Sequence, residues 1–164
     1  MTGEDAMAGD PAATIRTAGS ILSAHREAVH LPDDVAVRRE GQRLELPASE
    51  IEGAAIRDVG TDTANSFAHH VAEAGTLLVH GPLGVYEQPG FERGTRRVFA
   101  EASKAQAYTV IGGGHTVHAL AELGIDEHAF DHVSLAGGAL LTHLAGEELP
   151  GVAALRASRR PRTH

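Results

Sequence analysis

Residues 108–123, YTVIGGGHTVHALAEL, change from a strand pattern to a helix pattern within a single turn. Residues 108–111 are β-branched or aromatic, which predicts a short buried strand. Three glycines follow, and apolar residues then recur at helical spacing until Gly124, where the helix should end. Such a turn points the first free N–H groups of a helix at one place, where the helix dipole favours a phosphate.

Two other strand patterns also end in turns that contain glycine. Residues 76–79 lead into His80-Gly81-Pro82, and residues 132–135 lead into Ala136-Gly137-Gly138. Helical patterns lie between them, at about 92–102 and from 137 onward. This alternation predicts an α/β fold, with a partial doubly wound (Rossmann-like) parallel sheet of three to four strands and helices on both faces. The three turns should then lie on the same edge of the sheet.

The N-terminal part of the chain is predicted in less detail. Asp10-Pro11 resembles the start of a helix that continues to about residue 28. Residues 35–37 and 43–47 are predicted as short strands, and residues 58–63 as a turn that caps a helix running to about residue 74. Residues 1–10 are expected to form a disordered N-terminus. At the other end, residues 149–151 should close the last helix, and 158–164 should form a loose basic tail that begins near Arg156.

Composition excludes several classes of function. The net charge of −8 argues against a protein that binds nucleic acid or an anionic membrane. The chain has no cysteine, and therefore no disulfide or thiolate chemistry. No apolar run reaches the roughly 20 residues of a membrane span, and the acidic N-terminus is unlike a signal peptide, so we expect a cytoplasmic protein.

The glycine turns match neither common nucleotide fingerprint. Val117 stands where the dinucleotide motif requires glycine, and no Gly-Lys-Ser/Thr follows for a P-loop. Tight packing would explain any one of the turns equally well, but three in register favour phosphate binding. The pattern alone therefore predicts an α/β protein that binds phosphate.

Five blocks, in order along the chain, resemble the phosphoglycerate kinase family. HGPLGVYE at 80–87 resembles N-G-P-M-G-V-F-E, and GGGHT at 112–116 resembles G-G-G-[DH]-[TS] in the form of archaeal members. SLAGGA at 134–139, followed by LPGV at 149–152, resembles S-T-G-G-G-A…L-P-G-V. LPDDV at 31–35 and DVGTDT at 58–63 resemble L-P-x-D-[VF] and D-I-G-x-x-T. The resemblance covers only the later part of the family's C-terminal, nucleotide-binding domain, so residues 11–157 are expected to be a partial domain of that type.

This resemblance implies phosphoryl transfer between 1,3-bisphosphoglycerate and ADP, giving ATP and 3-phosphoglycerate. It implies ATP or ADP with Mg²⁺, the metal being held mainly by the nucleotide phosphates rather than by ligands from the chain. Glu87 would bind the ribose hydroxyls, and Gly137 and Gly138 would stabilise charge on the phosphoryl group in transfer. The residues implied to face the nucleotide phosphates are Gly112, Gly113, Gly114, His115 and Thr116.

The sequence also departs from the family pattern. His80 replaces an asparagine, and His115 replaces the aspartate of many members. The family's phosphoglycerate-binding domain, with its catalytic arginine, is not matched, nor is a nucleotide-binding lysine. Lys104, the only lysine, is expected on the outer face of a surface helix.

Several expectations follow from these departures. Phosphoglycerate would bind only through the unmatched domain, and the chain alone would be inactive. Residues 35–37 would have no neighbouring strand and would expose an apolar edge, which favours association with a complementary half or self-association. The alternative is a non-catalytic module that binds nucleotide or phosphate. A zinc site using His115 and His118 is disfavoured because further ligands at suitable spacing are missing, and a hydrolase based on Ser134 is disfavoured because the G-x-S-x-G motif is missing.

Overall fold

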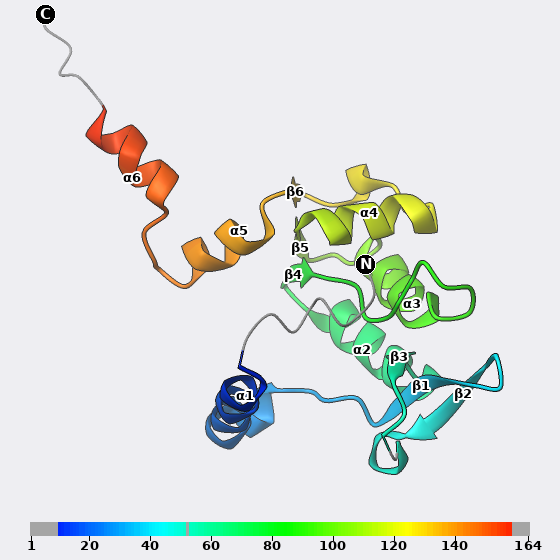
Figure 1. The fold of residues 1–164 in the computed structure, drawn as a ribbon. Helices are drawn as coiled ribbons and strands as arrows, with labels where there is room; N and C mark the ends of the chain where they lie inside the picture. The colour runs from blue at the N-terminus through cyan, green and yellow to red at the C-terminus, as the bar shows by residue number, and fades with distance from the viewer. Residues whose placement is uncertain (1–9, 52, 159–164) are drawn as a thin grey trace, which may run out of the picture. The chain divides into compact units, whose positions relative to one another are not determined.

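A computed structural model of the chain describes residues 10–51 and 53–158, which fall into two compact units divided after Pro32 (Figure 1). The first unit contains helix α1 (Pro11–His25). The Asp10 carboxylate accepts a hydrogen bond from the N–H two residues further on at 3.0 Å, which confirms the predicted start of this helix. Residues 1–9 of the predicted disordered N-terminus lie outside the described residues.

The second unit begins with an antiparallel sheet, of which the sequence predicted two strands, at 35–37 and 43–47, but not the third strand or the pairing. Its strands lie in the order β2 (Gln42–Pro47), β1 (Asp34–Arg39), β3 (Ile56–Val59). Glu40 and Gly41 join β1 to β2 with φ angles of 51° and 80°, and two successive positive φ values are typical of a type I′ hairpin turn. The expectation that residues 35–37 lack a neighbouring strand is therefore wrong, because β1 is paired on both sides.

Helix α2 (Thr61–Glu73) follows β3 directly, so the predicted turn at 58–63 is shorter than expected. Asp34 caps this helix: one carboxylate oxygen accepts from the Thr63 N–H at 2.8 Å and the other from the Asp62 N–H at 3.2 Å. Burial pushes the pKa of Asp34 upward, but the hydrogen bonds from Thr63 and Asp62 outweigh it, so the pKa lies below its ordinary value. The cap therefore ties β1 to α2.

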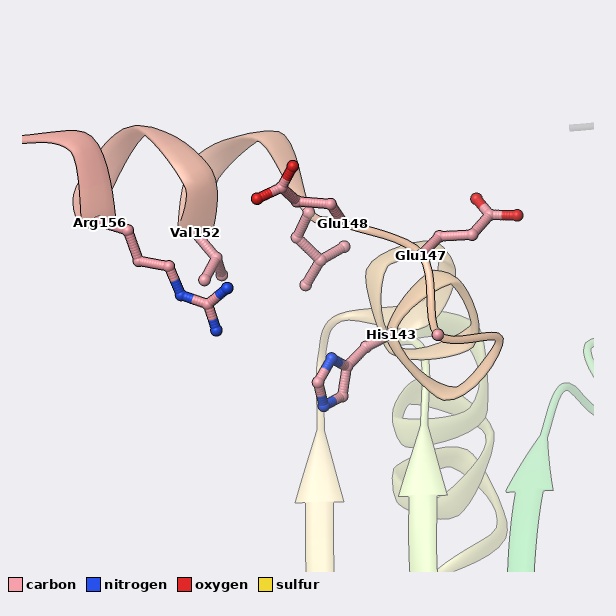
Figure 2. A pocket seen from close by; sticks show the side chains of 7 residues that line it. His143, Glu147, Glu148, Val152 and Arg156 are labelled. Carbon is pink, nitrogen blue, oxygen red and sulfur yellow. The ribbon is translucent and has the colours of Figure 1, made fainter.

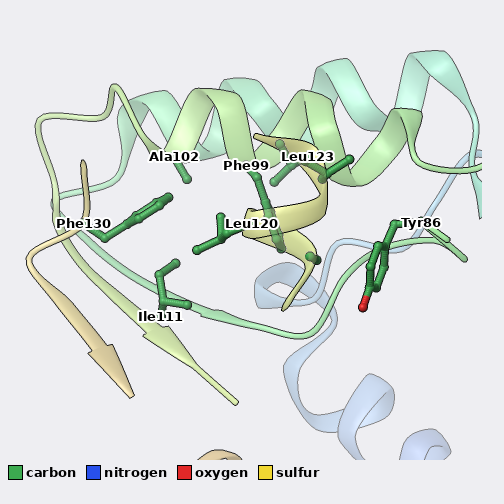
Figure 3. Close-up of a cluster of buried hydrophobic side chains, with 9 residues drawn as sticks. Tyr86, Phe99, Ala102, Ile111, Leu120, Leu123 and Phe130 are labelled. Atoms are coloured by element: carbon green, nitrogen blue, oxygen red, sulfur yellow. The ribbon is translucent and has the colours of Figure 1, made fainter. Parts of the chain in front are cut away.

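The remaining strands form a parallel sheet in the order β4 (Thr76–His80), β5 (Tyr108–Gly112), β6 (His132–Ser134) (Figure 1). Helix α3 (Arg93–Ala102) joins β4 to β5, and α4 (Gly114–Leu123) joins β5 to β6. Figure 3 shows their buried side chains meeting in the core, among them Phe99, Ile111 and Leu120. Helix α5 (Gly137–Leu144) reaches the opposite face, where Leu140 lies over Gly112. The predicted α/β fold, a three-stranded parallel sheet flanked by helices, is confirmed.

Part of the sheet face opposite α3 and α4 is open to solvent. Leu78 of β4 and Tyr108 of β5 lie on this face and are 43% and 57% exposed. The sequence predicted an exposed apolar edge at residues 35–37. Instead, β2 and β3 cover both edges of β1, and exposed apolar side chains, Leu78 and Tyr108 among them, lie elsewhere.

The C-terminal segment is more helical than predicted. Residues 149–151 do not close α5, which ends at Leu144. Pro150 instead begins a new helix, α6 (Pro150–Ala157). Proline suits a first helical position because the N–H that it lacks would have no acceptor there. The loose tail predicted from Arg156 is therefore wrong at its start, and residues 159–164 lie outside the described residues. Three short 3₁₀ turns complete the structure: η2 (Arg26–Ala28), η3 (Ala48–Glu50) and η4 (Glu127–Ala129).

In the part of the chain that the structure describes, no helix combines the length and the apolar character needed to cross a bilayer.

Candidate functional site

The three parallel strands end side by side. His80 of β4 is in register with Gly112 of β5, and Gly112 is in register with Ser134 of β6. The Gly113 N–H donates to the Ser134 carbonyl oxygen at 2.9 Å, which continues the pairing into the turn. The turns that follow the strands therefore lie on one edge of the sheet, as predicted.

Two of these turns touch through their backbones. A Cβ atom on Gly137 would lie 3.1 Å from Gly113 Cα and 3.1 Å from His80 Nε2. A Cβ atom on Gly113, whose φ is +95°, would lie 3.5 Å from Gly137 Cα and 3.4 Å from His80 Nε2. The positive φ of Gly113 favours glycine, and a side chain at Gly137 would crowd the neighbouring turn. The exposed His80 side chain lies against both turns.

Two helices begin at the same place. Helix α4 starts at Gly114 and α5 at Gly137, each directly after its strand and turn. Positions 114 and 138 face open space, since a Cβ atom at either would meet nothing within 4 Å. Free N–H groups and the positive ends of two helix dipoles therefore lie beside an accessible surface, an arrangement that favours an anion such as phosphate.

Thr116 has a structural role that the sequence did not suggest. Its side chain is buried, and its hydroxyl donates to the Gly112 carbonyl oxygen at 2.7 Å. The same hydroxyl accepts a hydrogen bond from the Gly81 N–H at 2.7 Å. It thus connects the turn after β4 to the turn after β5. A signal for the first bond was present, because a threonine in a helix often bonds to the carbonyl four residues earlier. A phosphate contact of Thr116 remains a prediction.

His115 and Glu87, the other predicted binding residues with side chains, are both exposed. His115 lies in the first turn of α4. Glu87 follows Tyr86, whose hydroxyl lies 2.8 Å from His118 Nδ1 on α4. Burial, followed by the nearby negative charge of Glu87, raises the pKa of Tyr86. The segment that contains Glu87 is therefore held against the same helix that carries Gly114 and His115.

A hollow in the C-terminal segment contains none of the predicted site residues. It has a volume of about 510 Å³ and lies between α5 and α6. Figure 2 shows the His143 ring and the Arg156 side chain extending away from the carboxylates of Glu147 and Glu148, so these charges do not converge. Within residues 10–51 and 53–158, no three histidine or carboxylate side chains lie close enough together to hold a metal ion. Lys104 lies exposed in the turn after α3 rather than on the helix itself.

Comparison with known proteins agrees with this geometry. A sequence model of the phosphoglycerate kinase family matches residues 2–147. The chain is 38% identical over 147 residues to the phosphoglycerate kinase of Methanothermobacter thermautotrophicus, and 43% identical over 145 residues to that of Halobacterium salinarum. These matches cover 90% and 87% of this chain, but only 36% of each relative.

A solved structure gives the same result. The crystal structure of phosphoglycerate kinase from Pyrococcus horikoshii superimposes with a TM-score of 0.77 at 33% sequence identity. The match covers 87% of this chain and 36% of that one, so the chain spans about a third of the length of the relatives it matches. The chain belongs to the phosphoglycerate kinase family.

Proposed function

We propose that the chain binds ADP or ATP where His80, Gly113 and Gly137 meet, and that it serves phosphoryl transfer between 1,3-bisphosphoglycerate and ADP. Products of the reaction are ATP and 3-phosphoglycerate. The observation that carries this proposal is the close approach of two glycine turns and two helix starts at one edge of the sheet. Positions 114 and 138, at the two helix starts beside this contact, face open space, which leaves room for a phosphate.

Each element then has a distinct role in the proposal. The N–H groups at the start of α4, from Gly114 and His115, bind the nucleotide phosphates. Gly137 and Gly138 at the start of α5 face the phosphoryl group in transfer, whose spreading negative charge is stabilised by donors already in place. Glu87 accepts hydrogen bonds from the ribose hydroxyls. Mg²⁺ is held mainly by the nucleotide phosphates, because histidine, as at His115, is a poor ligand for this hard cation.

Titration calorimetry on Glu87→Ala tests the nucleotide assignment. The variant should bind ADP more weakly than the unmodified chain, because the ribose contact is lost, while inorganic phosphate should bind with nearly unchanged affinity. Glu73→Ala is the matched control, since this carboxylate is 66% exposed at the end of α2 and precedes β4, at the opposite end of that strand from His80. Equal weakening of ADP and phosphate, or weakening of neither, would contradict the role of Glu87.

The alternative function, a non-catalytic module that binds nucleotide or phosphate, is distinguished by turnover. A coupled assay of the 164-residue chain should show ADP binding without product formation, because the family's catalytic arginine and nucleotide lysine are not among the matched residues. Measurable turnover by this chain alone would contradict that expectation. Phosphoglycerate is proposed to bind outside this chain, and a cytoplasmic location remains a prediction.

Association with a complementary half or with a second copy is proposed from the open face of the parallel sheet. Leu78 and Tyr108 lie exposed on it, and burial of such side chains stabilises a complex. Sedimentation velocity measures the result directly. A chain that remains monomeric at high concentration would leave only the complementary half as partner.

A further inference from the structure

Arg43 of β2 is a buried cation with four fixed partners. Its side chain is only 8% exposed. Nη1 donates to Asp58 Oδ2 at 2.9 Å and to the Gly90 carbonyl oxygen at 2.8 Å, and Nη2 donates to the Val59 carbonyl oxygen at 2.9 Å. Nε donates to Glu45 Oε1 at 2.9 Å. Burial disfavours the charged form, but Asp58 and Glu45 outweigh it and raise the pKa of Arg43, so the guanidinium stays charged.

Asp58, the main partner of Arg43, touches both ends of the turn that carries Glu87. We call residues 81–92 the Glu87 turn. The Asp58 side chain is fully buried, and its Oδ2 atom also accepts from the Gly94 N–H at 3.0 Å. A Cβ atom on Gly84 or on Gly94 would collide with the Asp58 carboxylate. The carboxylate thus packs against the backbone just before Glu87 and just after the turn.

Further contacts fix the Glu87 turn to the antiparallel sheet. The Val85 N–H donates to the Arg57 carbonyl oxygen of β3 at 2.7 Å. Phe91 is 2% exposed, and its ring centroid lies 5.2 Å from Arg38 Cζ and 5.8 Å from Arg43 Cζ. Glu87 itself remains exposed between these anchors. The antiparallel sheet therefore holds the backbone on both sides of Glu87, in addition to the contact of Tyr86 with α4.

We propose that Arg43 is a positioning residue for nucleotide binding, which holds the two ends of the Glu87 turn so that Glu87 meets the ribose. The inference rests on the proposed function, because it requires that Glu87 contacts the nucleotide. Arg43 acts through Gly90 and Asp58 and does not touch the ligand. Lysine cannot replace it, because an ammonium group lacks the planar fork that reaches the acceptors of Asp58, Gly90 and Val59 together.

Calorimetry of ADP and of inorganic phosphate with Arg43→Lys tests this role. We expect ADP affinity to fall roughly tenfold, the effect of one charge-assisted hydrogen bond, while phosphate affinity stays within about twofold. Arg16→Lys is the matched control, because Arg16 is 69% exposed on α1 and pairs only with Asp10 among the described residues. Since Arg43 acts through Glu87, Arg43→Lys should cause no further loss of ADP affinity in a Glu87→Ala background.

The possible outcomes separate the inference from the proposed function. Three results would overturn the positioning role. Arg43→Lys could weaken ADP binding and phosphate binding equally, it could weaken neither, or its effect on ADP affinity could add fully to that of Glu87→Ala. If the unmodified chain binds no ADP, the proposed function and the inference fail together. Should circular dichroism show that Arg43→Lys does not fold, Asp58→Asn provides the same comparison. Its amide oxygen can still accept from Arg43 and from the Gly94 N–H, although its amide nitrogen cannot accept from the Val59 N–H as Oδ1 does, so a smaller but equally ADP-selective loss is expected.

Discussion

Thr116→Val is the most direct test of how the turns at the proposed site are held together. Thr116 is 1% exposed, and its hydroxyl makes two hydrogen bonds of 2.7 Å, to the Gly112 carbonyl oxygen and from the Gly81 N–H. Valine has nearly the same shape but neither donates nor accepts. The substitution therefore removes both bonds without creating a cavity, and it separates the turn after β4 from the turn after β5.

The expected loss follows from the two bonds. Each intramolecular hydrogen bond contributes about 1 kcal/mol net, so the free energy of unfolding should fall by about 2 kcal/mol, or about 3 if the Gly81 N–H finds no water. For a protein of this size the urea midpoint should fall by about 1 M. Thr116→Ser keeps the hydroxyl and loses one buried methyl group, which should cost about 0.8 kcal/mol.

Urea unfolding followed by circular dichroism compares the two variants directly. Thr116→Val should unfold at a clearly lower urea concentration than Thr116→Ser, with an unchanged dependence of the free energy on urea. If the valine variant is as stable as the serine variant or more so, the hydroxyl does not stabilise the turns, and the reasoning above is refuted.

Three further predictions address the phosphate site and the helix cap. Gly137→Ala places a methyl group 3.1 Å from Gly113 Cα and from His80 Nε2. Calorimetry should therefore show ADP affinity and phosphate affinity falling together, unlike the ADP-selective loss expected for Glu87→Ala. An ADP-selective loss in Gly137→Ala would contradict a phosphate site shared by the two turns. The folded-state pKa of Asp34 lies below its unfolded value, so its contribution to stability is present above about pH 4 and is lost as the pH falls through the folded-state pKa. Urea unfolding at pH 7 and pH 3 should therefore show a smaller acid-induced loss for Asp34→Asn than for the unmodified chain, and an equal loss would exclude this role. His80→Ala removes the imidazole that lies against both glycine turns, so calorimetry should show weaker binding of both ADP and phosphate, whereas unchanged affinities would show that His80 does not meet the phosphates.

The parallel half of the fold was predictable because its signals are local. Each strand is a short apolar run, and each turn contains glycine within a few residues of the strand end. The third strand of the antiparallel sheet, and the pairing of the two strands that were predicted, were missed for the opposite reason. β3 has only four residues, and its buried Asp58 reads in the sequence as a turn residue, since its partner Arg43 lies 15 positions earlier. Such a partner across the sheet cannot be recognised from neighbouring residues.

The same distinction applies to the site. The glycine turns could be found from the sequence, because backbone approach requires glycine wherever it occurs. The support of the Glu87 turn could not, because Arg43, Asp58 and Phe91 meet only after two sheets have formed. The helix α6 was missed because Pro150 was interpreted as the end of one helix, although proline is equally suited to start the next.

The position of the charged side chains explains how a chain with a net charge of −8 can offer a site for an anion. Two of its arginines are committed to partners within the fold: Arg43 to Asp58 and Glu45, and Arg97 to Glu101. The contacts at the convergence of the turns come instead from backbone groups of Gly113 and Gly137 and from one imidazole. Backbone N–H groups at helix starts attract a phosphate over a short range, whatever the net charge of the surface. Nucleotide binding at this edge therefore depends on the exact approach of the glycine backbones, which Thr116 holds from one side, while the ribose end depends on Arg43 and the antiparallel sheet.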